Sequence, residues 1–335
     1  MFTIIWRKKI IFLCLFLSVA AFLAGVFVAK TLYMVEPSVD NKEDLLENSL
    51  RGRDSAKWGF INPLLDCTEI KNISNKEVVD LKEEIFNFIE KQKKIGNVDS
   101  MAVYFRDLNN GPWFGISEKE NFYPASLLKV PLMLSVLRQS MDDPSFLVKQ
   151  FVWQGPSKNN EYFKAAEELQ EGVTYSVGEA LSYMIRYSDN NAAEALVHIV
   201  DKSVLLESYN YLGIKPPEDS GYEISVRTYA SFFRILYNST FLNKEYSEDA
   251  LHLLSNTEFS KGIVAGVPAS IKVAHKFGER EASSDVKQLH DCGIIYLSNR
   301  PYLLCVMTRG KSFDKMALAI QEVSKIVYDS VSAIK

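Results

Sequence analysis

Residues 122–137, FYPASLLKVPLMLSVL, join a turn signal to a long apolar run. Pro124 predicts a turn, and the apolar run beyond Lys129 predicts a helix. Ser126 then stands at the start of that helix, where its own N–H is unpaired and can bind a developing oxyanion. Lys129 follows one turn later on the same face, within reach of the serine oxygen. A buried, unprotonated lysine at this place can act as the base that activates the serine.

The S-x-x-K spacing is weak evidence by itself, because it also occurs at Ser284–Lys287 and Ser312–Lys315. Those copies lack the preceding turn and the long apolar helix. In isolation, Ser126 fits an ordinary helix-capping serine and Lys129 a solvated lysine. Whether this stretch is functional therefore depends on what the rest of the chain brings to it.

A second motif, Ser188-Asp189-Asn190, follows a helical pattern that ends at about residue 187, and S-D-N occurs once in the chain. By itself it fits a polar connector between two helices. Beside the first motif, Ser188 can relay a proton between Lys129 and a leaving group. Asn190 can exchange hydrogen bonds with a substrate amide, while Asp189 points inward and fixes the turn.

A third motif, Lys276-Phe277-Gly278, ends the apolar strand IKVAHKFG, although K-x-G occurs twice more in the chain. Lys276 supplies positive charge for a substrate carboxylate. Gly278 permits a close approach of the backbone to the nucleophile. The next N–H, that of Glu279, can complete an oxyanion hole with the N–H of Ser126.

The order of the remaining patterns predicts the architecture. Helical periodicity covers residues 76–95 and 316–334, and it dominates a central block at about 126–262. Within that block, Ser176 and Glu179 are expected to form a capping box, and Ser225 is expected to cap another helix. Strand patterns occur at residues 101–108, 113–116, 271–276, 293–297 and 302–308. This order predicts an α/β (α+β) domain: an antiparallel sheet flanked by the N- and C-terminal helices, with an inserted all-helical subdomain.

The N-terminus predicts the compartment. Residues 10–29, IIFLCLFLSVAAFLAGVFVA, carry no charge, and as a helix they span a bilayer of about 30 Å. Three basic residues precede them, so we expect a cytoplasmic tail at 1–9, a transmembrane signal anchor at 10–29 and a tether at 30–75. Residues 76–335 then form an extracytoplasmic domain on a single-pass protein of the cell membrane, and a cleaved signal peptide is the alternative. Within the tether, Trp58–Leu65 is apolar and is expected to dock onto the domain.

Composition and spacing exclude several classes of protein. The formal net charge is −4, which disfavours nucleic-acid binding. The histidines lack H-x-H or H-E-x-x-H spacing and no C-x-x-C occurs, so we expect no metal site and no cofactor. No G-x-S-x-G occurs either, so a Ser-His-Asp hydrolase is not expected. A two-residue turn near Arg300 places Cys292 diagonally from Cys305, roughly 7–8 Å away. That distance is long for a disulfide, so we expect two small buried hydrophobic residues.

Together the three motifs resemble those of the penicillin-recognising serine hydrolases, specifically the class A β-lactamase-like branch. The resemblance covers about residues 76–335. It implies a β-lactamase/transpeptidase-like fold, in which Ser126 forms an acyl-enzyme and Lys129 and Ser188 move protons. It also implies that Asn190 and Lys276 hold a β-lactam or a D-Ala-D-Ala-type peptide. We expect a monomer that opens the β-lactam amide.

Two departures from the family pattern leave alternatives open. The family carries a glutamate that activates the deacylating water, in an E-x-x-L-N loop; here residues 212–223 offer only Glu218, Asp219 and Glu223. Phe277 stands where the family has Thr or Ser, and the strand 293–297 has no arginine, which leaves Arg280 and Arg309 as weak candidates for holding a carboxylate. The alternatives are a penicillin-binding D,D-carboxypeptidase-like enzyme with slow deacylation, and a non-catalytic module that binds peptidoglycan or a protein.

Overall fold

The computed structural model describes residues 58–62, 75–109, 111–159, 161–218, 221–298 and 300–334. The predicted cytoplasmic tail (1–9), the signal anchor (10–29) and most of the tether lie outside the described residues. Within the described ranges, no helix is both long enough and apolar enough to cross a bilayer.

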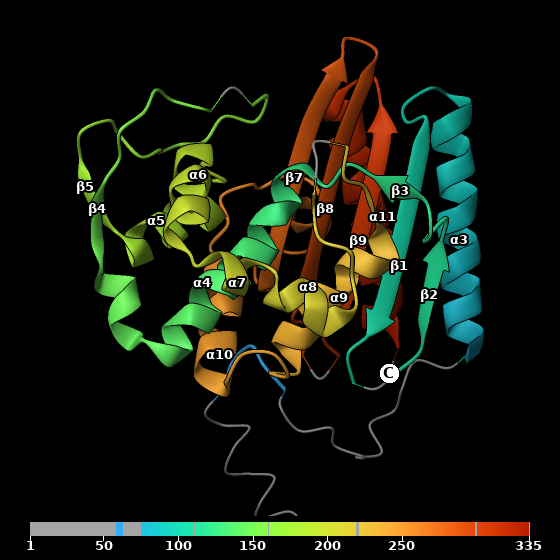
Figure 1. The fold of residues 1–335 in the computed structure, drawn as a ribbon. Coiled ribbons are helices and arrows are strands. Elements are labelled where there is room, and N and C mark those ends of the chain that lie inside the picture. Colours follow the sequence, from blue (N-terminus) through green and yellow to red (C-terminus); the bar gives the residue numbers. More distant parts are fainter. Residues whose placement is uncertain are drawn as a thin grey trace, which may run out of the picture. The chain divides into compact units, whose positions relative to one another are not determined.

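A five-stranded antiparallel sheet forms the centre of the domain (Figure 1). Its strands, in spatial order, are β2 (Trp113–Ile116), β1 (Ser100–Asp107), β9 (Tyr302–Gly310), β8 (Val286–Ile295) and β7 (Val273–Ser283). The predicted antiparallel sheet is confirmed. Strands β7 and β8 are longer than predicted, because they continue into a hairpin whose polar residues hide the strand pattern.

The two terminal helices cover one face of the sheet, as predicted. They are α3 (Asn75–Lys94) and α11 (Phe313–Ala333), which bury their apolar stripes against alternate residues of the strands, such as Met101 and Phe105 of β1. Phe86 of α3 lies outside this buried stripe and is 48% exposed. It follows the buried Ile85 directly, and adjacent helical positions point about 100° apart.

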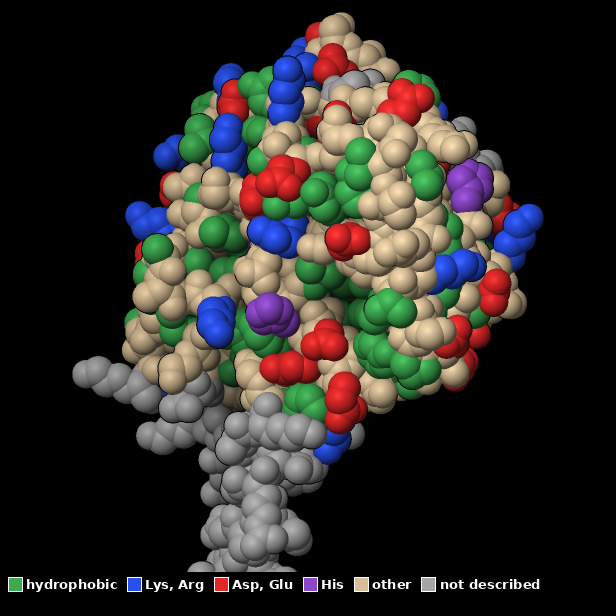
Figure 2. All heavy atoms as spheres, turned by 90° about the vertical axis from the view of Figure 1, so that its left-hand side faces the viewer, with side chains coloured by type: hydrophobic (Ala, Val, Ile, Leu, Met, Phe, Trp, Pro, Cys, Tyr) green, Lys and Arg blue, Asp and Glu red, His purple; other side chains and the backbone are tan. Residues whose placement is uncertain are grey.

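Helices pack against the other face of the sheet and beside β7 (Figure 1). They are α4 (Lys129–Asp142), α5 (Val177–Arg186), α6 (Asn190–Ile199), α7 (Lys202–Leu205), α8 (Glu207–Leu212), α9 (Val226–Tyr237) and α10 (Lys244–Leu254). The short 3₁₀ turns are η1 (Ala125–Leu128), η2 (Pro144–Val148) and η3 (Val264–Gly266). One small two-stranded sheet pairs β3 (Asn121–Phe122) with β6 (Ile224–Ser225). A second pairs β4 (Gln150–Val152) with β5 (Thr174–Ser176). The predicted capping box of Ser176 and Glu179 and the predicted cap at Ser225 are both present. Figure 2 shows this helical side, where acidic and basic side chains are interspersed.

Residues 58–62 dock onto the domain, as predicted for this part of the tether. The carboxylate of Glu248 on α10 accepts hydrogen bonds from the backbone N–H groups of Gly59, Phe60 and Ile61. The hydroxyl of Tyr296 donates to the carbonyl oxygen of Phe60 at 3.1 Å. Side chains from α10 and from the connection after β8 therefore fix this short segment. Residues 63–65 lie outside the described ranges.

The prediction for the two strand cysteines was wrong. Cys292 and Cys305 lie directly opposite each other on β8 and β9, with their Cα atoms 4.0 Å apart, and they form a disulfide. The connection from Ile295 to Tyr302 is longer than the two-residue turn that was assumed. The connection is also centred one residue earlier than the assumed turn at residues 299–300, which moves every cross-strand partner by two residues and turns the diagonal arrangement into a direct pair.

Candidate active site

Ser126 lies at a strained corner between β3 and α4. Ala125 has a φ of +50°, a value that non-glycine residues rarely adopt, and Ser126 follows it in the 3₁₀ turn η1, which runs directly into α4. Strain of this kind persists only where the surrounding structure holds it, and it is concentrated at functional sites. The predicted position of Ser126, after a turn and at the start of a helix, is confirmed.

Strand β8 holds the chain that leads into this corner. The side-chain oxygen of Gln288 accepts from the N–H of Tyr123 at 3.1 Å. His290 Nδ1 accepts from the N–H of Thr308, so its Nε2 carries the proton and donates to the carbonyl oxygen of Tyr123 at 2.9 Å. Burial lowers the pKa of His290 to about 4, which keeps the ring neutral and this arrangement intact at ordinary pH.

Strand β7 passes close beside the same corner at Gly278. A Cβ atom on Gly278 would lie 2.9 Å from the carbonyl oxygen of Pro124, 3.0 Å from the nitrogen of Leu127 and 3.1 Å from the nitrogen of Ser126. Only glycine permits this approach without a shift of the backbone. The close approach predicted for Gly278 is present.

The Lys129 amine is buried behind the serine hydroxyl. Its Nζ lies 3.0 Å from Ser126 Oγ, 3.2 Å from Ser188 Oγ and 2.6 Å from Asn190 Oδ1, and it also contacts the carbonyl oxygen of Ser188. Burial lowers the pKa of Lys129 to about 8, against the opposing charges of Glu161, Asp189 and Glu279. Near neutral pH a fraction of this amine is therefore unprotonated, and its nitrogen can accept the proton of Ser126.

The turn of the second motif brings Ser188 and Asn190 to Lys129. Ser188 adopts a φ of +59°, a second strained residue at this site. Asp189 is fully buried and caps α6, because its carboxylate accepts from the N–H groups of Asn191 and Ala192. The predicted inward orientation of Asp189 is confirmed, and it explains how the turn is held.

Lys276 continues the chain of polar groups on the far side of Ser188. Its Nζ donates to Ser188 Oγ at 2.8 Å and to the carbonyl oxygen of Phe277 at 2.9 Å, and its side chain is 0% exposed. Burial, with the charge of Lys129, holds its pKa well below the usual range. The structure thus links Ser126, Lys129, Ser188 and Lys276 into one line of hydrogen-bonding groups.

The ring of Phe277 lies at the end of this line, with its centroid 4.3 Å from the amine of Lys276. The same ring stacks on Phe259 with the ring centroids 4.0 Å apart, and both belong to the cluster under α11. Phe277 therefore offers no polar atom where the family has a hydroxyl. The residue that departs from the motif serves packing.

Glu279, next along β7, is half-buried beside Ser126. Its Oε1 accepts from the N–H of Phe163 at 3.0 Å, while Oε2 is buried without a partner among the described residues. Burial, with the nearby Glu161, raises the pKa of Glu279 to about 7. The sequence predicted a role for its N–H alone, and the position of its carboxyl was not anticipated.

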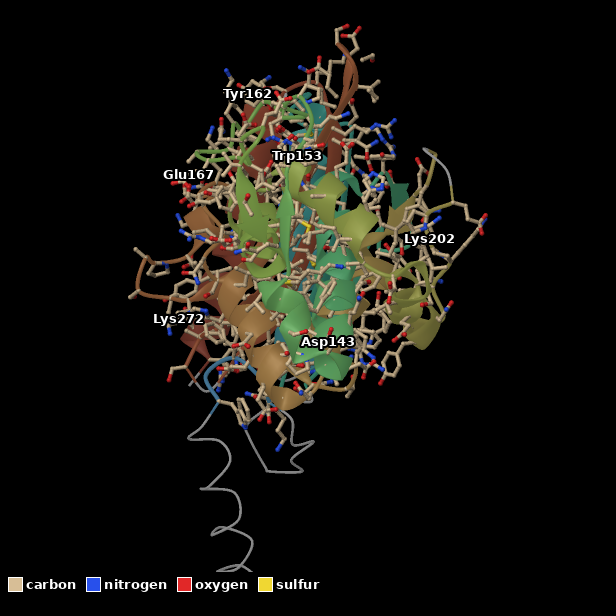
Figure 3. All side chains as sticks on the ribbon, turned by 60° about the vertical axis from the view of Figure 1, so that its left-hand side comes forward. Asp143, Trp153, Tyr162, Glu167, Lys202 and Lys272 are labelled. Atoms are coloured by element: carbon tan, nitrogen blue, oxygen red, sulfur yellow. A yellow bond between two sulfur atoms is a disulfide. The ribbon has the colours of Figure 1, made fainter. Side chains whose placement is uncertain are left out.

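A polar cavity of about 550 Å³ opens at Ser126, between β7 and the connection from β4 to β5. Its lining residues are Tyr123, Ala125, Ser126, Glu161, Tyr162, Asn190, Glu279, Arg280, Glu281 and Phe313. Glu161 accepts a hydrogen bond from Asn190 Nδ2. Figure 3 shows Tyr162 near the top of the view, on this connection. Sequence reasoning missed Glu161 and Tyr162, because they lie in a stretch without periodicity or motif.

An apolar cavity of about 510 Å³ lies on the other side of Ser126 and Lys129. Leu128, Leu132, Val197, Leu205, Leu206, Tyr209 and Pro217 make up most of its wall. Glu194 is the one carboxylate among the described residues that line it, and its side chain is 40% exposed and 3.6 Å from the amine of Lys158.

The acids expected from residues 212–223 do not line either cavity at Ser126. Glu218 is exposed and paired with Lys215 at 3.1 Å, and Glu223 lines a separate cavity with it. Asp219 lies outside the described residues.

Of the two candidate arginines, only Arg280 lines the polar cavity. Its guanidinium lies 3.5 Å from the ring centroid of Tyr123. Arg309 pairs with Glu120 at 3.3 Å instead.

Groups of acidic, histidine and cysteine side chains that could hold a metal ion are absent from the described part of the chain. His290 and Asp291, which are adjacent in sequence, face opposite sides of β8. Asp291 binds His275 Nδ1 at 2.8 Å, whereas His290 faces Tyr123.

Comparison with known proteins agrees with this geometry. A family model described as "Beta-lactamase enzyme family" matches residues 80–331. The chain belongs to this family. A curated relative, a beta-lactamase of Bacteroides uniformis, is 25% identical over 248 residues, which are 67% of this chain and 83% of that protein.

Solved structures of β-lactamases and of PBP-A share the fold. A beta-lactamase from Chitinophaga pinensis superposes with a TM-score of 0.65 at 19% identity, over 75% of this chain and 99% of that one. A class A beta-lactamase from Bacteroides cellulosilyticus gives a TM-score of 0.64 at 20% identity, over 76% and 99%. PBP-A gives 0.63 at 18% identity, over 77% and 97%. At these identities the likeness establishes a β-lactamase-like fold of antiparallel sheet and helices.

Proposed function

We propose that this protein is a serine hydrolase that opens β-lactam amides through an acyl-enzyme on Ser126. The observation that supports it most directly is the 3.0 Å distance from Lys129 Nζ to Ser126 Oγ, in a buried site that lowers the pKa of that lysine to about 8. A nucleophile within hydrogen-bond reach of a base, which is itself oriented by a third group, is the arrangement that covalent catalysis requires.

Acylation uses the residues along this line. Ser126 Oγ attacks the amide carbonyl while its proton passes to Lys129 Nζ. The N–H groups of Ser126 and Glu279 hold the oxyanion, since Gly278 brings β7 against η1. Ser188, bonded to both lysines, returns a proton to the leaving nitrogen as the ring opens. Asn190 holds the substrate. Lys276 holds Ser188 through its hydrogen bond to the Ser188 hydroxyl.

Deacylation is expected to be slow. The water that releases the acyl group needs a base, and a positioned base is worth about 10²–10⁴ in rate. The apolar cavity at Lys129 has Glu194 as its carboxylate, and that group is exposed and paired with Lys158. This observation favours a second candidate, a penicillin-binding D,D-carboxypeptidase-like enzyme that acts on D-Ala-D-Ala-type peptides.

One experiment separates the candidates: incubation of the full chain with a fluorescent penicillin and with a chromogenic cephalosporin, with Ser126→Ala as the control. Sustained colour change at many turnovers supports a β-lactamase. A stable fluorescent label without turnover supports the carboxypeptidase-like enzyme. Equal inertness of wild type and Ser126→Ala contradicts both and leaves a non-catalytic binding module.

We also propose that the enzyme acts as a monomer on the outer side of the cell membrane, held by residues 10–29. The uncharged length of this segment and the basic residues before it support the anchor. The disulfide between Cys292 and Cys305 supports an oxidising compartment. Membrane fractionation with protease treatment of intact cells tests this: the domain should sediment with membranes and be digested from outside. Recovery in the soluble cytoplasmic fraction refutes the anchor.

A further inference from the structure

Three arginine side chains gather around two stacked aromatic rings at the β2 edge of the sheet. Arg106 of β1 lies opposite Trp113 of β2 in the register, so both side chains point to the same face. The ring of Tyr104 stacks on that of Trp113, with the centroids 5.7 Å apart. The guanidinium of Arg227 on α9 lies 4.6 Å from the Trp113 centroid. Arg234 follows two turns later on the same face of α9, close enough to Arg106 for their charges to interact.

The protein leaves these three charges without partners of opposite sign. Within the described ranges, none of the three guanidinium groups forms an ion pair or donates a hydrogen bond. Arg234 is half-buried, and its burial, together with the charge of Arg106, lowers its pKa. A guanidinium carries five N–H donors in a planar fork that fits the oxygens of a phosphate group. The arrangement therefore fits an anion that comes from outside the domain.

Two acidic residues lie near these arginines, and both are held elsewhere. Asp107, next to Arg106 in sequence, is 2% exposed, and its carboxylate accepts from the N–H of Asn109 at 2.8 Å. Glu118 follows β2 and packs over Gly115, where an added Cβ would lie 2.5 Å from its side chain. This edge of the sheet therefore holds more positive than negative charge beside an exposed indole ring.

The arginines lie at the end of the domain where the tether docks. The N–H of Asn62 donates to the carbonyl oxygen of Tyr237 at 2.8 Å, three residues after Arg234 on α9. Figure 1 shows residues 58–62 and the connection from β1 to β2 at the same, lower end of the domain. In sequence, this docked segment leads back to residues 10–29, the proposed anchor. A bilayer offers phosphate oxygens at its surface, and tryptophan rings are enriched at its interface with water.

We propose that Arg106, Arg227, Arg234 and Trp113 dock this edge of the domain onto an anionic phospholipid surface. The guanidinium groups bind headgroup phosphates, and the ring of Trp113, which is 40% exposed, enters the interface. Asp249 of α10 is exposed at the same end of the domain, which confines the contact to the β2 edge. The inference rests on the proposed anchor, and it adds to that anchor a fixed orientation of the domain on the membrane.

Quenching of Trp113 fluorescence by brominated lipids tests this docking. The full chain is reconstituted into brominated vesicles of phosphatidylcholine, with or without an equal part of phosphatidylglycerol, and into their unbrominated counterparts. Because the chain has four tryptophans, Trp113→Phe measured in parallel gives the share of Trp113 by difference. Trp113 should be quenched in the vesicles with phosphatidylglycerol and not in those without it. The quenching should fade as the Debye length falls from about 10 Å at about 0.1 M salt to about 3 Å at about 1 M.

Substitutions assign the effect to the arginines. Each arginine near an anionic surface contributes about fivefold to the ratio of docked to undocked domain, so Arg227→Gln should lower this ratio about fivefold and the triple glutamine variant about 100-fold. Arg138→Gln is the matched control, because Arg138 pairs with Asp142 and Glu207, each at 3.1 Å. It should change the ratio by less than about twofold. Denaturant titration shows whether each variant is folded, and Arg227→Gln, at an exposed position, carries the test if the triple variant is not.

The possible failures are distinguishable. If the chain floats with neither kind of vesicle in a density gradient, the proposed anchor fails and the inference fails with it. If the chain enters both and Trp113 is quenched equally, or not at all, the docking is overturned while the anchor stands. Equal effects of Arg227→Gln and Arg138→Gln also overturn it. A loss of quenching when inorganic phosphate replaces chloride at equal ionic strength assigns the arginines to a soluble phosphate and overturns the membrane contact.

Discussion

Gly278→Ala separates the positioning of the nucleophile from the stability of the fold. The new Cβ would lie 2.9–3.1 Å from three backbone atoms of η1 and the residue before it, whereas carbon contacts are comfortable at about 3.5 Å. Strand β7 and η1 must therefore separate by about half an ångström. A displacement of 1 Å at a catalytic site can cost about 100-fold in rate, so half of it predicts about a tenfold loss.

The assay for this prediction is the second-order rate of Ser126 acylation by a fluorescent penicillin. Gly278→Ala should acylate about tenfold more slowly and lose about 1–3 kcal/mol of unfolding free energy through overpacking. Gly96→Ala is the control: Gly96 has a φ of +70° and open space around it, so alanine there costs stability without touching the site. Unchanged acylation in Gly278→Ala, or an equal loss in Gly96→Ala, would refute the reasoning that this contact positions the nucleophile.

Three further predictions concern the base, the disulfide and the docked segment. The acylation rate should rise with pH and level off above about pH 8, because only the neutral amine of Lys129 accepts a proton. The substitution Lys129→Arg should abolish this rise, because the guanidinium stays protonated. A rate that falls with increasing pH contradicts the role of Lys129 as the base. Reduction of the Cys292–Cys305 disulfide should lower the unfolding free energy by about 2–4 kcal/mol in denaturant titrations, an effect that must vanish in the double alanine variant. Glu248→Ala should cost about 1–3 kcal/mol by leaving the backbone N–H groups of residues 59–61 unpaired, with acylation unaltered; a loss of acylation without a loss of stability contradicts a purely structural role.

The elements that carry the three motifs were predictable because their signals are local. An apolar periodicity after Pro124, a single S-D-N between helical patterns and a strand that ends in glycine each specify one element. Their order then specified an antiparallel sheet with terminal helices. Local signals do not show that the three motifs lie close together in space. That expectation came from the resemblance to a family, and the structure supplies the distances.

The remaining features depend on long-range geometry. The disulfide was missed because the register of β8 and β9 follows from where their connection is centred, and a turn placed one residue away moves every cross-strand pair. The polar residues after Gly278 concealed the extension of β7, so the carboxyl of Glu279 was not recognised as part of the site. Glu161 accepts a hydrogen bond from Asn190, but it lies in the connection from β4 to β5, where the sequence has neither a periodic pattern nor a motif that predicts this contact.

The central claim is that Ser126 is a nucleophile activated by a buried lysine, and the mass of the intact protein tests it most directly. After incubation with saturating penicillin G, the wild-type chain should gain the full mass of the ligand, since ring opening retains every atom, and peptide mapping should place the adduct on Ser126. Lys129→Met should gain it far more slowly and Ser126→Ala not at all. An adduct on another residue, or an unmodified wild-type chain, would contradict the account.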